Sequence, residues 1–431
     1  MAKCRCALLI ILSTLCLSGP LPAQEPDAPP AGDPEFADRR PRSMEEQLQG
    51  AQQRMQQQYG DAQQRQVEEM GRLSLRMEAQ YRALAERMEQ QRAQFRARVA
   101  QQWAAVEESS EKTWVDYGEK TDARSKVDFE KGEVEIEVLV PLARGQAPGK
   151  LSPAEEQPLR ALAREKLRAQ THRMLAQAEP QAPPPPPQRE ESPSPATRAE
   201  PAAPVMAGQL RDAAGGAVTE RGADKFVDEQ LAPKMVIDPS PVVGADGKAR
   251  IKVKVRVAMV PGHLKVRADR YTAQVNAQAR KLAVDPSLIL AVMQTESSFN
   301  PMARSNAGAF GLMQLIPRAA AHEAYRHLYK TDKLVTPEYL YDPDHNIELG
   351  AGYLQLLQTA YFGKVRSEAS RQVLSIASYN CGPTRVRKTV VAGRDLDAMT
   401  PAQVLELVRR LTPEETRNYV ARVRERMALY R

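Results

Sequence analysis

A glutamate near the end of a predicted helix has the surroundings of a general acid. Asp285 is a suitable N-cap, Pro286 is a suitable first helical residue, and Asn300-Pro301 predicts the end of the helix. Glu296 falls on the apolar face of this helix, close to its C-terminal end. Burial and the negative end of the helix dipole both disfavour an ionised carboxylate, so we expect a raised pKa. A carboxyl group that stays protonated near neutral pH can donate a proton during catalysis.

Polar groups that could bind a ligand follow this helix in two places. A loop with Gly308 and Gly311 allows the backbone to approach a ligand closely, and Gln314 adds an amide that can donate and accept hydrogen bonds. Tyr379 and Asn380 bring a phenol and a second amide at the end of a later helix. A lone glutamate is usually a solvated surface residue, but together these groups favour a binding site.

Three motifs in a fixed order resemble the lytic transglycosylase family, goose-lysozyme-like enzymes that cleave the glycan strands of peptidoglycan. The family patterns E-S-x-F, G-L-M-Q and A-Y-N correspond to residues 296–299, 311–314 and 378–380, where serine replaces the alanine. Residues 342–354 and 415–420 also resemble family blocks. Any one motif alone would be weak, whereas five ordered blocks are a specific signal.

The resemblance implies an enzyme that cleaves the β-1,4 bond between N-acetylmuramic acid (MurNAc) and N-acetylglucosamine (GlcNAc) without water. Glu296 would protonate the oxygen that leaves C1 of MurNAc. It would then act as a base and take the proton of the C6 hydroxyl, which leaves a 1,6-anhydro-MurNAc end. The resemblance implies neither a cofactor nor a metal, and the scattered histidines show no metal-ligand spacing. A role in cell-wall turnover and remodelling would follow.

Six residues in these blocks are candidates for substrate binding. They are Ser297, Ser305, Met313, Gln314, Tyr379 and Asn380. The two amides can hydrogen-bond N-acetyl or hydroxyl groups, and the phenol can hydrogen-bond the catalytic acid or the substrate. The two serines either order the loop of the glutamate or touch the sugar. The methionine either lines the cleft or packs in the core.

Two functions from other classes remain open. A lysozyme-type peptidoglycan hydrolase would use water and a second carboxylate. Asp332, Asp342 and Glu348 are candidates, but the sequence does not locate them relative to the acid. A non-catalytic scaffold that binds the cell wall would use residues 43–111 and would have no need of Glu296.

The first 42 residues have the composition of an export signal and a linker. Lys3 and Arg5 precede an apolar run too short to span a membrane, so residues 1–23 predict a secretory signal peptide. Residues 24–42 are rich in Pro, Ala and Asp and predict a disordered linker. Cys16 follows a leucine, a poor match to a lipidation signal. We therefore expect a soluble protein in the periplasm of a Gram-negative bacterium, with a lipid-anchored outer-membrane form as the alternative.

The overall charge is mildly basic. The 431 residues contain 61 Lys+Arg against 54 Asp+Glu, a net charge of +7. No basic block with interleaved aromatic residues occurs, which argues against nucleic-acid binding. A basic surface suits an anionic polymer such as peptidoglycan. After removal of the signal only Cys381 remains, so we expect no intrachain disulfide.

A long amphipathic helix is predicted over residues 43–111. Apolar residues follow three- and four-residue steps from Met70 to Val106, and no proline interrupts them. The pattern indicates a coiled coil or a helical hairpin. One helix of this length cannot bury its apolar stripe alone in water. We therefore expect residues 43–111 to self-associate or to bind a protein partner, and to be dispensable for the chemistry.

Residues 112–262 predict a small α+β domain. Apolar residues alternate on both sides of a turn at 130–132, which predicts a β-hairpin, and alternate again over 251–257. A helix is predicted over 152–177. The strands on either side of a proline-rich disordered insertion, residues 179–216, are expected to share one sheet.

Two segments narrow the family resemblance. Residues 120–132 and 259–264 resemble the N-terminal domain of a membrane-bound, lipid-anchored type of lytic transglycosylase. The long helix and the proline-rich insertion fall outside this resemblance. The whole chain is thus predicted to be mainly α. It has an all-helical, lysozyme-like catalytic domain over residues 263–431, preceded by the small α+β domain and the long N-terminal helix.

Overall fold

The computed structural model describes most of the chain beyond its first 42 residues. The described ranges are 43–142, 151–181 and 202–431. The predicted signal peptide, the linker after it and Cys16 lie outside these ranges. Across the described ranges, no helix combines the length and the apolar character that a membrane span would need.

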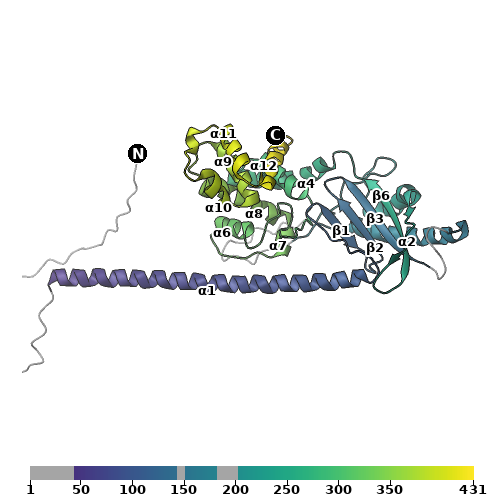
Figure 1. Ribbon diagram of the computed structural model, residues 1–431, viewed down its shortest axis with the longest axis horizontal. Helices are drawn as coiled ribbons and strands as arrows, with labels where there is room; N and C mark the ends of the chain where they lie inside the picture. The colour runs from purple at the N-terminus through teal and green to yellow at the C-terminus, as the bar shows by residue number, and fades with distance from the viewer. Residues whose placement is uncertain (1–42, 143–150, 182–201) are drawn as a thin grey trace, which may run out of the picture. The chain divides into compact units, whose positions relative to one another are not determined.

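A single long helix, α1 (Met44–Ala100), forms most of the N-terminal region (Figure 1). Its sequence is dense in Gln, Arg, Glu and Ala, which favour a helix, and it contains no proline. The chain divides into two compact units, residues 1–74 and residues 75–431, and α1 contributes to both. The helix predicted over residues 43–111 is therefore present, but it ends at Ala100.

The end of α1 is set by burial of the residues that follow it. Trp103 is buried, and its indole N–H donates a hydrogen bond of 2.6 Å to the carbonyl of Thr121. Val99 packs beside Trp103 in a small apolar cluster, and Met88 packs against the helical core of the C-terminal region. The last part of α1 therefore packs with the domains that follow it. The expected boundary after residue 111 does not separate α1 from these domains.

An antiparallel sheet follows α1 (Figure 1). Its strands are β1 (Thr113–Tyr117), β2 (Ala123–Asp128), β3 (Glu133–Pro141), β4 (Val236–Ile237), β5 (Val242–Val243) and β6 (Ala249–Ala258). The spatial order is β1-β2-β3-β6-β4, and β5 also pairs with β6. The β2–β3 pair is the predicted hairpin. Pairing of β3 with β6 confirms that strands on either side of the proline-rich insertion share one sheet.

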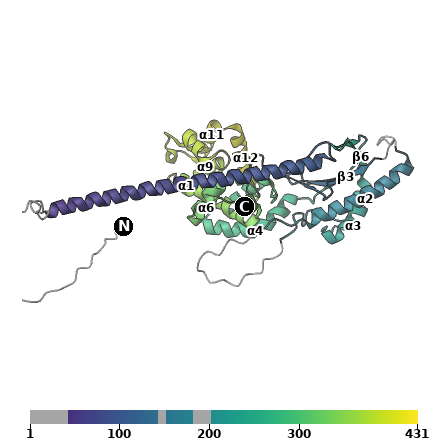
Figure 2. The ribbon, with the colours of Figure 1, turned by 90° about the horizontal axis from the view of Figure 1, so that it is seen from below.

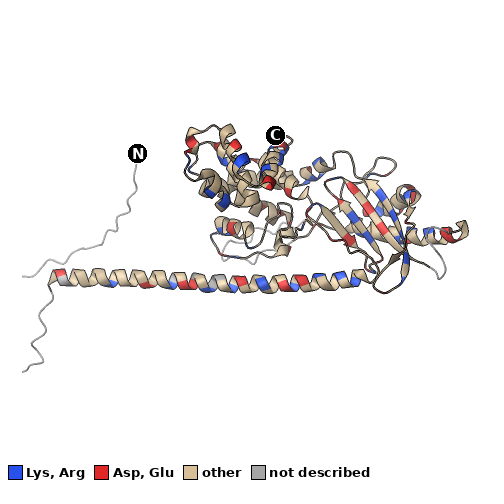
Figure 3. Ribbon diagram, viewed as in Figure 1, with Lys and Arg blue, Asp and Glu red and all other residues tan. Residues whose placement is uncertain are grey.

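The two faces of the sheet differ as the alternating pattern predicts. The valine and isoleucine side chains of β3 lie in the core. On the other face, acidic residues of β3 stand beside basic residues of β6 (Figure 3). Glu135 pairs with Arg256, and Glu137 lies 3.4 Å from the Lys252 ammonium group. Such cross-strand ion pairs favour this register over a shift by one residue.

The predicted helix over residues 152–177 is confirmed as α2 (Pro153–Ala176). Ser152 and Glu155 form a capping box at its start. Leu159 and Leu167 are buried among the apolar side chains of the sheet. Short helical segments lie beside α2 (Figure 2). They are η3 (Glu220–Gly222), α3 (Ala223–Phe226), η4 (Val227–Leu231) and η5 (Ala232–Lys234).

The end of the predicted disordered insertion, residues 179–216, is instead part of the fold. Val205, Met206 and Leu210 are buried in the core of the α+β domain. The Val205 N–H donates to the carbonyl of Gln177 (2.8 Å), and a second backbone bond beside it, 2.9 Å long, joins residues 179 and 203. The high proline content predicted disorder over the whole segment, but its last apolar residues are buried in the core. The middle of the insertion lies outside the described residues.

The C-terminal region is helical throughout, as predicted. Its helices are α4 (His263–Leu282), α5 (Pro286–Ser297), α6 (Ala320–Tyr329), α7 (Pro337–Tyr341), α8 (Pro343–Leu356), η6 (Leu357–Tyr361), α9 (Glu368–Cys381), α10 (Pro383–Val386), η7 (Arg387–Val391), η8 (Leu396–Ala398), α11 (Pro401–Leu411) and α12 (Glu414–Met427). Helix α5 is almost entirely buried and packs against α4 and α12. The predicted fold class is confirmed: a helical domain preceded by a small α+β domain and a long helix.

Candidate active site

Helix α5 places Glu296 at its last turn. The helix begins as predicted, because the Asp285 carboxylate accepts a 2.8 Å hydrogen bond from the Ser287 N–H and Pro286 takes the first position. At the other end, Ser298 (φ 53°) and Phe299 (φ 61°) both adopt the left-handed conformation. Two such residues in succession without glycine are strained, and strain of this kind is concentrated at functional sites.

Glu296 is half-buried, and its carboxyl group has an altered pKa. Burial raises the pKa of Glu296 to about 7, and the nearby Glu111 acts in the same direction. A hydrogen bond from Tyr419 and the charges of Lys112 and Arg422 act in the opposite direction, and burial outweighs them. The expected rise in the pKa is therefore confirmed, and close to neutral pH the group exchanges a proton readily.

Tyr419 is the direct partner of the acid. Its hydroxyl donates a 2.7 Å hydrogen bond to Oε1 of Glu296. The Tyr379 hydroxyl, for which we expected a bond to Glu296 or to substrate, donates instead to the carbonyl of Met313 (2.9 Å). Tyr379 nevertheless lies close enough to the acid for the charge of Glu296 to help raise the pKa of its phenol. Tyr419 lies in the block 415–420, but the motif gave it no role.

The G-L-M-Q loop is fixed by an asparagine that sequence reasoning did not single out. Asn346 accepts a 2.8 Å hydrogen bond from the Met313 N–H and donates to the carbonyls of Phe310 (2.9 Å) and Leu340 (2.7 Å). A Cβ on Gly311 (φ 73°) would lie 2.2 Å from the Leu340 carbonyl oxygen, so only glycine fits. The signal for Asn346 was its place in the block 342–354.

Met313 and Gln314 occupy different environments in this loop. The Met313 side chain is fully buried in the helical core and lies against Gly350. Gln314 has a positive φ of 48° and is partly exposed. Its amide donates a 3.0 Å hydrogen bond to the Gly311 carbonyl, which holds the side chain against the loop. The structure thus puts the amide at the loop surface and the thioether in the core.

The two serines order the loops beside the acid. The buried Ser297 hydroxyl donates to the carbonyls of Leu312 (2.7 Å) and Met293 (3.1 Å), which ties the end of α5 to the G-L-M-Q loop. The Ser305 hydroxyl accepts a 3.0 Å hydrogen bond from the Ala309 N–H. Of the two roles considered for these serines, loop ordering is the one their contacts perform.

Asn380 joins α9 to α12. Its Oδ1 accepts a 2.7 Å hydrogen bond from the Thr416 hydroxyl, and its Nδ2 lies 3.4 Å from Oε1 of Glu415. Helix α12 also carries Tyr419, so the A-Y-N-like motif and the last motif meet in space. The last motif also lies beside α5, because α12 packs against α5 as well as α9.

The three carboxylates considered for a second catalytic group are engaged elsewhere. Asp342 caps α8 and accepts a 3.0 Å hydrogen bond from the His345 N–H. Glu348 accepts a 2.5 Å hydrogen bond from the Tyr329 hydroxyl, and Asp332 pairs with a histidine. Within the described residues, no cluster of three or more His, Cys, Asp or Glu side chains is arranged to hold a metal ion.

A buried arginine connects the loop after Glu296 to the α+β domain. Arg267, on α4, has a relative exposure of 1 %. Its guanidinium donates to the carbonyls of Ser298 (3.1 Å) and Phe129 (2.5 Å) and to the side-chain oxygen of Gln209 (2.7 Å). Burial lowers the pKa of Arg267 to about 9. Nothing in the motifs pointed to this residue, because its partners come from three separate segments.

The segment just before β1 also borders the acid. The Asn300 side chain donates a 3.2 Å hydrogen bond to the Glu111 carbonyl, and the Arg304 N–H lies 3.4 Å from the carbonyl of Ser110. Glu111 and Lys112 both influence the pKa of the acid. The α+β domain therefore contributes to the surroundings of the candidate active site.

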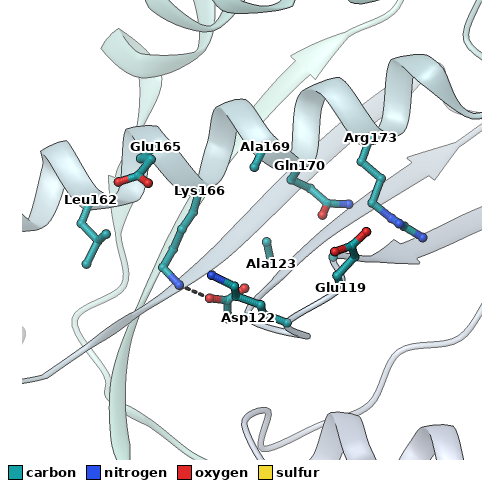
Figure 4. Close-up of a pocket in the computed structure, with 11 residues that line it drawn as sticks. Glu119, Asp122, Ala123, Leu162, Glu165, Lys166, Ala169, Gln170 and Arg173 are labelled. Carbon is teal, nitrogen blue, oxygen red and sulfur yellow. Dashed lines mark hydrogen bonds and ion pairs between the residues drawn. The ribbon is translucent and has the colours of Figure 1, made fainter.

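A separate pocket lies in the α+β domain between α2 and the β1–β2 turn (Figure 4). Its volume is about 630 Å³. Charged and amide side chains line it, namely Glu119, Lys120, Asp122, Glu165, Lys166, Gln170 and Arg173. Lys166 forms an ion pair with Asp122 across it. None of the residues predicted for the active site lines this pocket.

Two family models match this chain. Residues 273–398 match the transglycosylase SLT domain, and residues 81–146 match the N-terminal domain of membrane-bound lytic murein transglycosylase C. The first range contains the candidate acid, and the second joins the end of α1 to the sheet. The chain is thus similar to both domains, which confirms the predicted resemblance to lytic transglycosylases.

Individual proteins show the same similarity. Membrane-bound lytic murein transglycosylase C from Cronobacter sakazakii is 35% identical over 237 residues, which are 53% of this chain and 63% of that protein. The protein of the same name from Klebsiella pneumoniae is 34% identical over 235 residues, with the same coverage of 53% and 63%. The chain therefore spans less than two thirds of the length of these curated relatives.

Solved structures of soluble lytic transglycosylases align with part of the chain. An inactive mutant of lytic transglycosylase Slt from Pseudomonas aeruginosa gives a TM-score of 0.30 at 34% identity, covering 37% of this chain and 23% of that one. The 70 kDa soluble lytic transglycosylase from Escherichia coli gives a TM-score of 0.29 at 29% identity, covering 37% and 24%.

Proposed function

We propose that this protein is a peptidoglycan lytic transglycosylase. It cleaves the β-1,4 bond between MurNAc and GlcNAc without water and leaves 1,6-anhydro-MurNAc ends. One observation supports this proposal above the others: Glu296, which lies in the range that matches the SLT domain, has a pKa raised to about 7 and accepts a hydrogen bond from Tyr419. The proposed biological role is cell-wall turnover and remodelling.

The proposed mechanism uses one carboxyl group twice. The Tyr419 hydroxyl donates a hydrogen bond to Oε1, so the acidic proton of Glu296 resides on Oε2. Glu296 gives this proton to the glycosidic oxygen as the bond from C1 of MurNAc breaks. The Tyr419 hydrogen bond then stabilises the carboxylate. The carboxylate takes the proton of the C6 hydroxyl as that oxygen bonds to C1, so proton and charge balance over the cycle.

The other candidate residues are proposed to bind or to frame the glycan. Gln314 and Asn380 are partly exposed amides, suited to hydrogen bonds with N-acetyl and hydroxyl groups. Tyr379, Ser297, Met313 and Ser305 form the frame, because their described contacts are with backbone groups and core side chains. Their contribution to binding acts through the position of the G-L-M-Q loop and the end of α5.

Digestion in water enriched in ¹⁸O tests the proposed reaction. Purified peptidoglycan is digested with the mature chain, and the sugar ends are analysed by mass spectrometry. A transglycosylase gives anhydro ends that are one water lighter than reducing ends and carry no label. Labelled reducing ends would instead identify a lysozyme-type hydrolase. Binding without any released fragment would identify a non-catalytic scaffold. The Glu296→Gln variant, which keeps the side-chain volume, serves as the inactive control.

The proposed location is the periplasm of a Gram-negative bacterium. The basis is the predicted signal peptide, and the relatives from Cronobacter sakazakii and Klebsiella pneumoniae are named membrane-bound. We propose a soluble mature form, because Leu15 before Cys16 suits lipidation poorly. Mass spectrometry of the mature N-terminus decides this point. A lipid-modified Cys16 would replace the soluble form by an anchored one.

The proposed partner segment is residues 43–111. Its apolar stripe supports self-association or the binding of a protein partner, in addition to the glycan strands that the SLT domain would bind. The described structure uses the last part of this segment for packing within the chain. The part of α1 before residue 75 is thus the proposed surface for association.

A further inference from the structure

An eleven-residue repeat runs through α1. An apolar residue opens the repeats at residues 44–54, 55–65 and 77–87, others follow four and seven positions later, and an arginine closes each of them, whereas the repeat at residues 66–76 opens with a glutamine. Equivalent positions of successive repeats form four columns. The opening column is Met44, Met55, Gln66, Met77 and Met88, and the second is Leu48, Tyr59, Met70 and Tyr81. The third is Ala51, Ala62, Leu73, Leu84 and Phe95, and the closing column is Arg54, Arg65, Arg76, Arg87 and Arg98. We call the first three columns the α1 stripe.

The C-terminal part of the α1 stripe packs against the rest of the chain. Met77, Tyr81 and Leu84 are partly buried, and Met88 packs against the helical core. The guanidinium of Arg318 lies 5.3 Å from the centre of the Tyr81 ring. In this part of α1 the stripe is therefore a packing surface.

The N-terminal part of the same stripe is exposed. Met44 is 85 % exposed, Leu48 is 61 % exposed, and Met55 and Tyr59 are both 68 % exposed. Residues 44–74 would span about 46 Å of helix at 1.5 Å per residue. Four large apolar side chains exposed on one face over residues 44–59 are costly in water, and no described residue covers them.

The period of the repeat specifies the kind of helix that can cover this part. Eleven residues in three turns correspond to about 3.67 residues per turn, slightly more than the 3.6 of a straight helix. Helices with this period wrap around each other with a right-handed supercoil, opposite to heptad coiled coils. A heptad helix would therefore lose contact along the stripe, whereas a second copy of α1 has the matching period throughout.

The charge of this part disfavours other occupants. Residues 44–74 contain five acidic side chains, namely Glu45, Glu46, Asp61, Glu68 and Glu69, and three basic ones, namely Arg54, Arg65 and Arg72. The resulting net charge of −2 does not attract an anionic glycan or an anionic membrane surface. A second copy with mixed charges and many glutamines is compatible with it.

We propose that residues 44–74 pair with the same segment of a second copy of this chain in a right-handed, two-stranded coiled coil. This inference rests on the association segment of the proposed function and identifies its partner. It leaves residues 77–99 in their contacts with the chain's own body, and the pairing uses no residue of the candidate active site.

Sedimentation equilibrium of the full mature chain tests the pairing at micromolar concentration. The wild-type protein should have the mass of two chains. The double variant Met55→Glu/Tyr59→Glu, which charges the stripe, should have the mass of one chain. The matched control Gln53→Glu/Gln57→Glu adds the same charge on the opposite, exposed face and should keep the mass of two chains. Circular dichroism checks that all three have the same helix content.

Two deletions test the period itself. Removing residues 55–65 takes out one whole repeat and rotates the remaining stripe by only about 20°. Removing residues 55–63 rotates it by about 180°, because each residue contributes about 100°. The first deletion should keep the mass of two chains, and the second should give one. Equal behaviour of the two deletions would overturn the eleven-residue pairing.

Other outcomes also decide the proposal. It would be overturned by a wild-type mass of one chain or of three, or by a two-chain mass in the Met55→Glu/Tyr59→Glu variant. A single chain that binds peptidoglycan or vesicles through α1 would overturn it in favour of those occupants. Glycan cleavage is a separate readout. An active protein with the mass of one chain contradicts only the pairing, and an inactive protein with the mass of two chains contradicts only the proposed function.

Discussion

The Tyr419 hydroxyl donates a 2.7 Å hydrogen bond to Oε1 of Glu296. This bond joins α12, near the C-terminus, to the last turn of α5. Burial raises the pKa of the acid to about 7, and the bond from Tyr419 works against this rise. The pair therefore sets both the orientation of the carboxyl group and the pH range over which it holds its proton.

Replacing Glu296 by Gln should abolish turnover and leave glycan binding intact. The amide keeps the volume of the side chain but has no acidic proton, so kcat should fall by about a thousandfold or more. Release of soluble fragments measures turnover, and co-sedimentation with peptidoglycan measures binding. Glu368→Gln, at the exposed start of α9, is the matched control and should behave as wild type. Activity of Glu296→Gln within a few-fold of wild type would contradict the assignment.

The pH dependence of kcat should have an alkaline limb near pH 7. The acid is active when protonated, so kcat falls as the pH rises through its pKa of about 7. Tyr419→Phe removes a hydrogen bond that lowers this pKa, so the limb should move to higher pH, while kcat falls about tenfold through lost orientation.

Tyr430→Phe is the control for this shift, because Tyr430 donates to Gln294 (2.8 Å) and not to the acid. Its alkaline limb should stay at the wild-type pH. A limb that moves to lower pH in Tyr419→Phe would show that the sign of the interaction is wrong.

The same carboxyl group should lower the stability of the protein above neutral pH. Its pKa is raised from 4.5 to about 7 on folding. The folded state thus binds more protons than the unfolded state between these values, so stability falls as the pH rises through this range. Glu296→Gln should raise the free energy of unfolding by about 1 to 3 kcal/mol at pH 8. Near pH 4 it should change little. Urea unfolding at both pH values measures this, and equal effects at the two would contradict it.

Loss of Arg267 should weaken both the fold and the active site. Arg267→Met leaves the carbonyls of Ser298 and Phe129 and the amide of Gln209 without their buried donor. The free energy of unfolding should fall by about 3 kcal/mol or more. Because Ser298 follows the acid closely, kcat per folded molecule should also fall, by about tenfold.

Arg256→Lys is a control for the change in stability, because this arginine forms an exposed pair on the sheet. Its effect should stay within about 1 kcal/mol. Urea unfolding and kcat measured on the folded fraction separate the two effects of Arg267. A stable Arg267→Met variant with unchanged kcat would show that the link to Ser298 has no consequence.

Truncation should show which part of the long helix is dispensable. A chain that begins at Leu75 retains Val99 and Trp103 and should cleave glycan with wild-type kcat. A chain that begins near residue 112 lacks both. It should unfold at a temperature lower by about 5 °C or more, because it loses buried apolar surface and the 2.6 Å bond from Trp103 to the β1–β2 turn. Differential scanning calorimetry compares the two. Equal unfolding temperatures would show that residues 75–111 do not stabilise the folded body, as the expected domain boundary after residue 111 implies.

Local signals in the sequence were reliable where the structure depends on neighbouring residues. The start of α5 follows from Asp285 and Pro286, and the β3–β6 pairing follows from alternation on both strands. The motifs identified Glu296, and its burial explains the raised pKa.

The features that the sequence did not predict depend on contacts between segments that are far apart in the chain. The bond from Tyr419 to Glu296 depends on the contact of α12 with α5. The end of α1 depends on the packing of Trp103 against Tyr117 of β1 and on its hydrogen bond to the β1–β2 turn. The partners of Arg267 come from three separate segments, and no local sequence pattern predicts that these segments come together.

The two ends of the proline-rich insertion are fastened together. Backbone hydrogen bonds of 2.8 and 2.9 Å join the residues after α2 to those around Val205. Because these bonds hold the two ends together, we expect the sheet to tolerate a change in the length of the chain between them. Each doubling of the loop adds only about 0.6 kcal/mol of closure entropy. The length of this segment can therefore vary at little cost in free energy, and a fluorescent reporter or an affinity tag inserted between its two ends should leave the sheet intact.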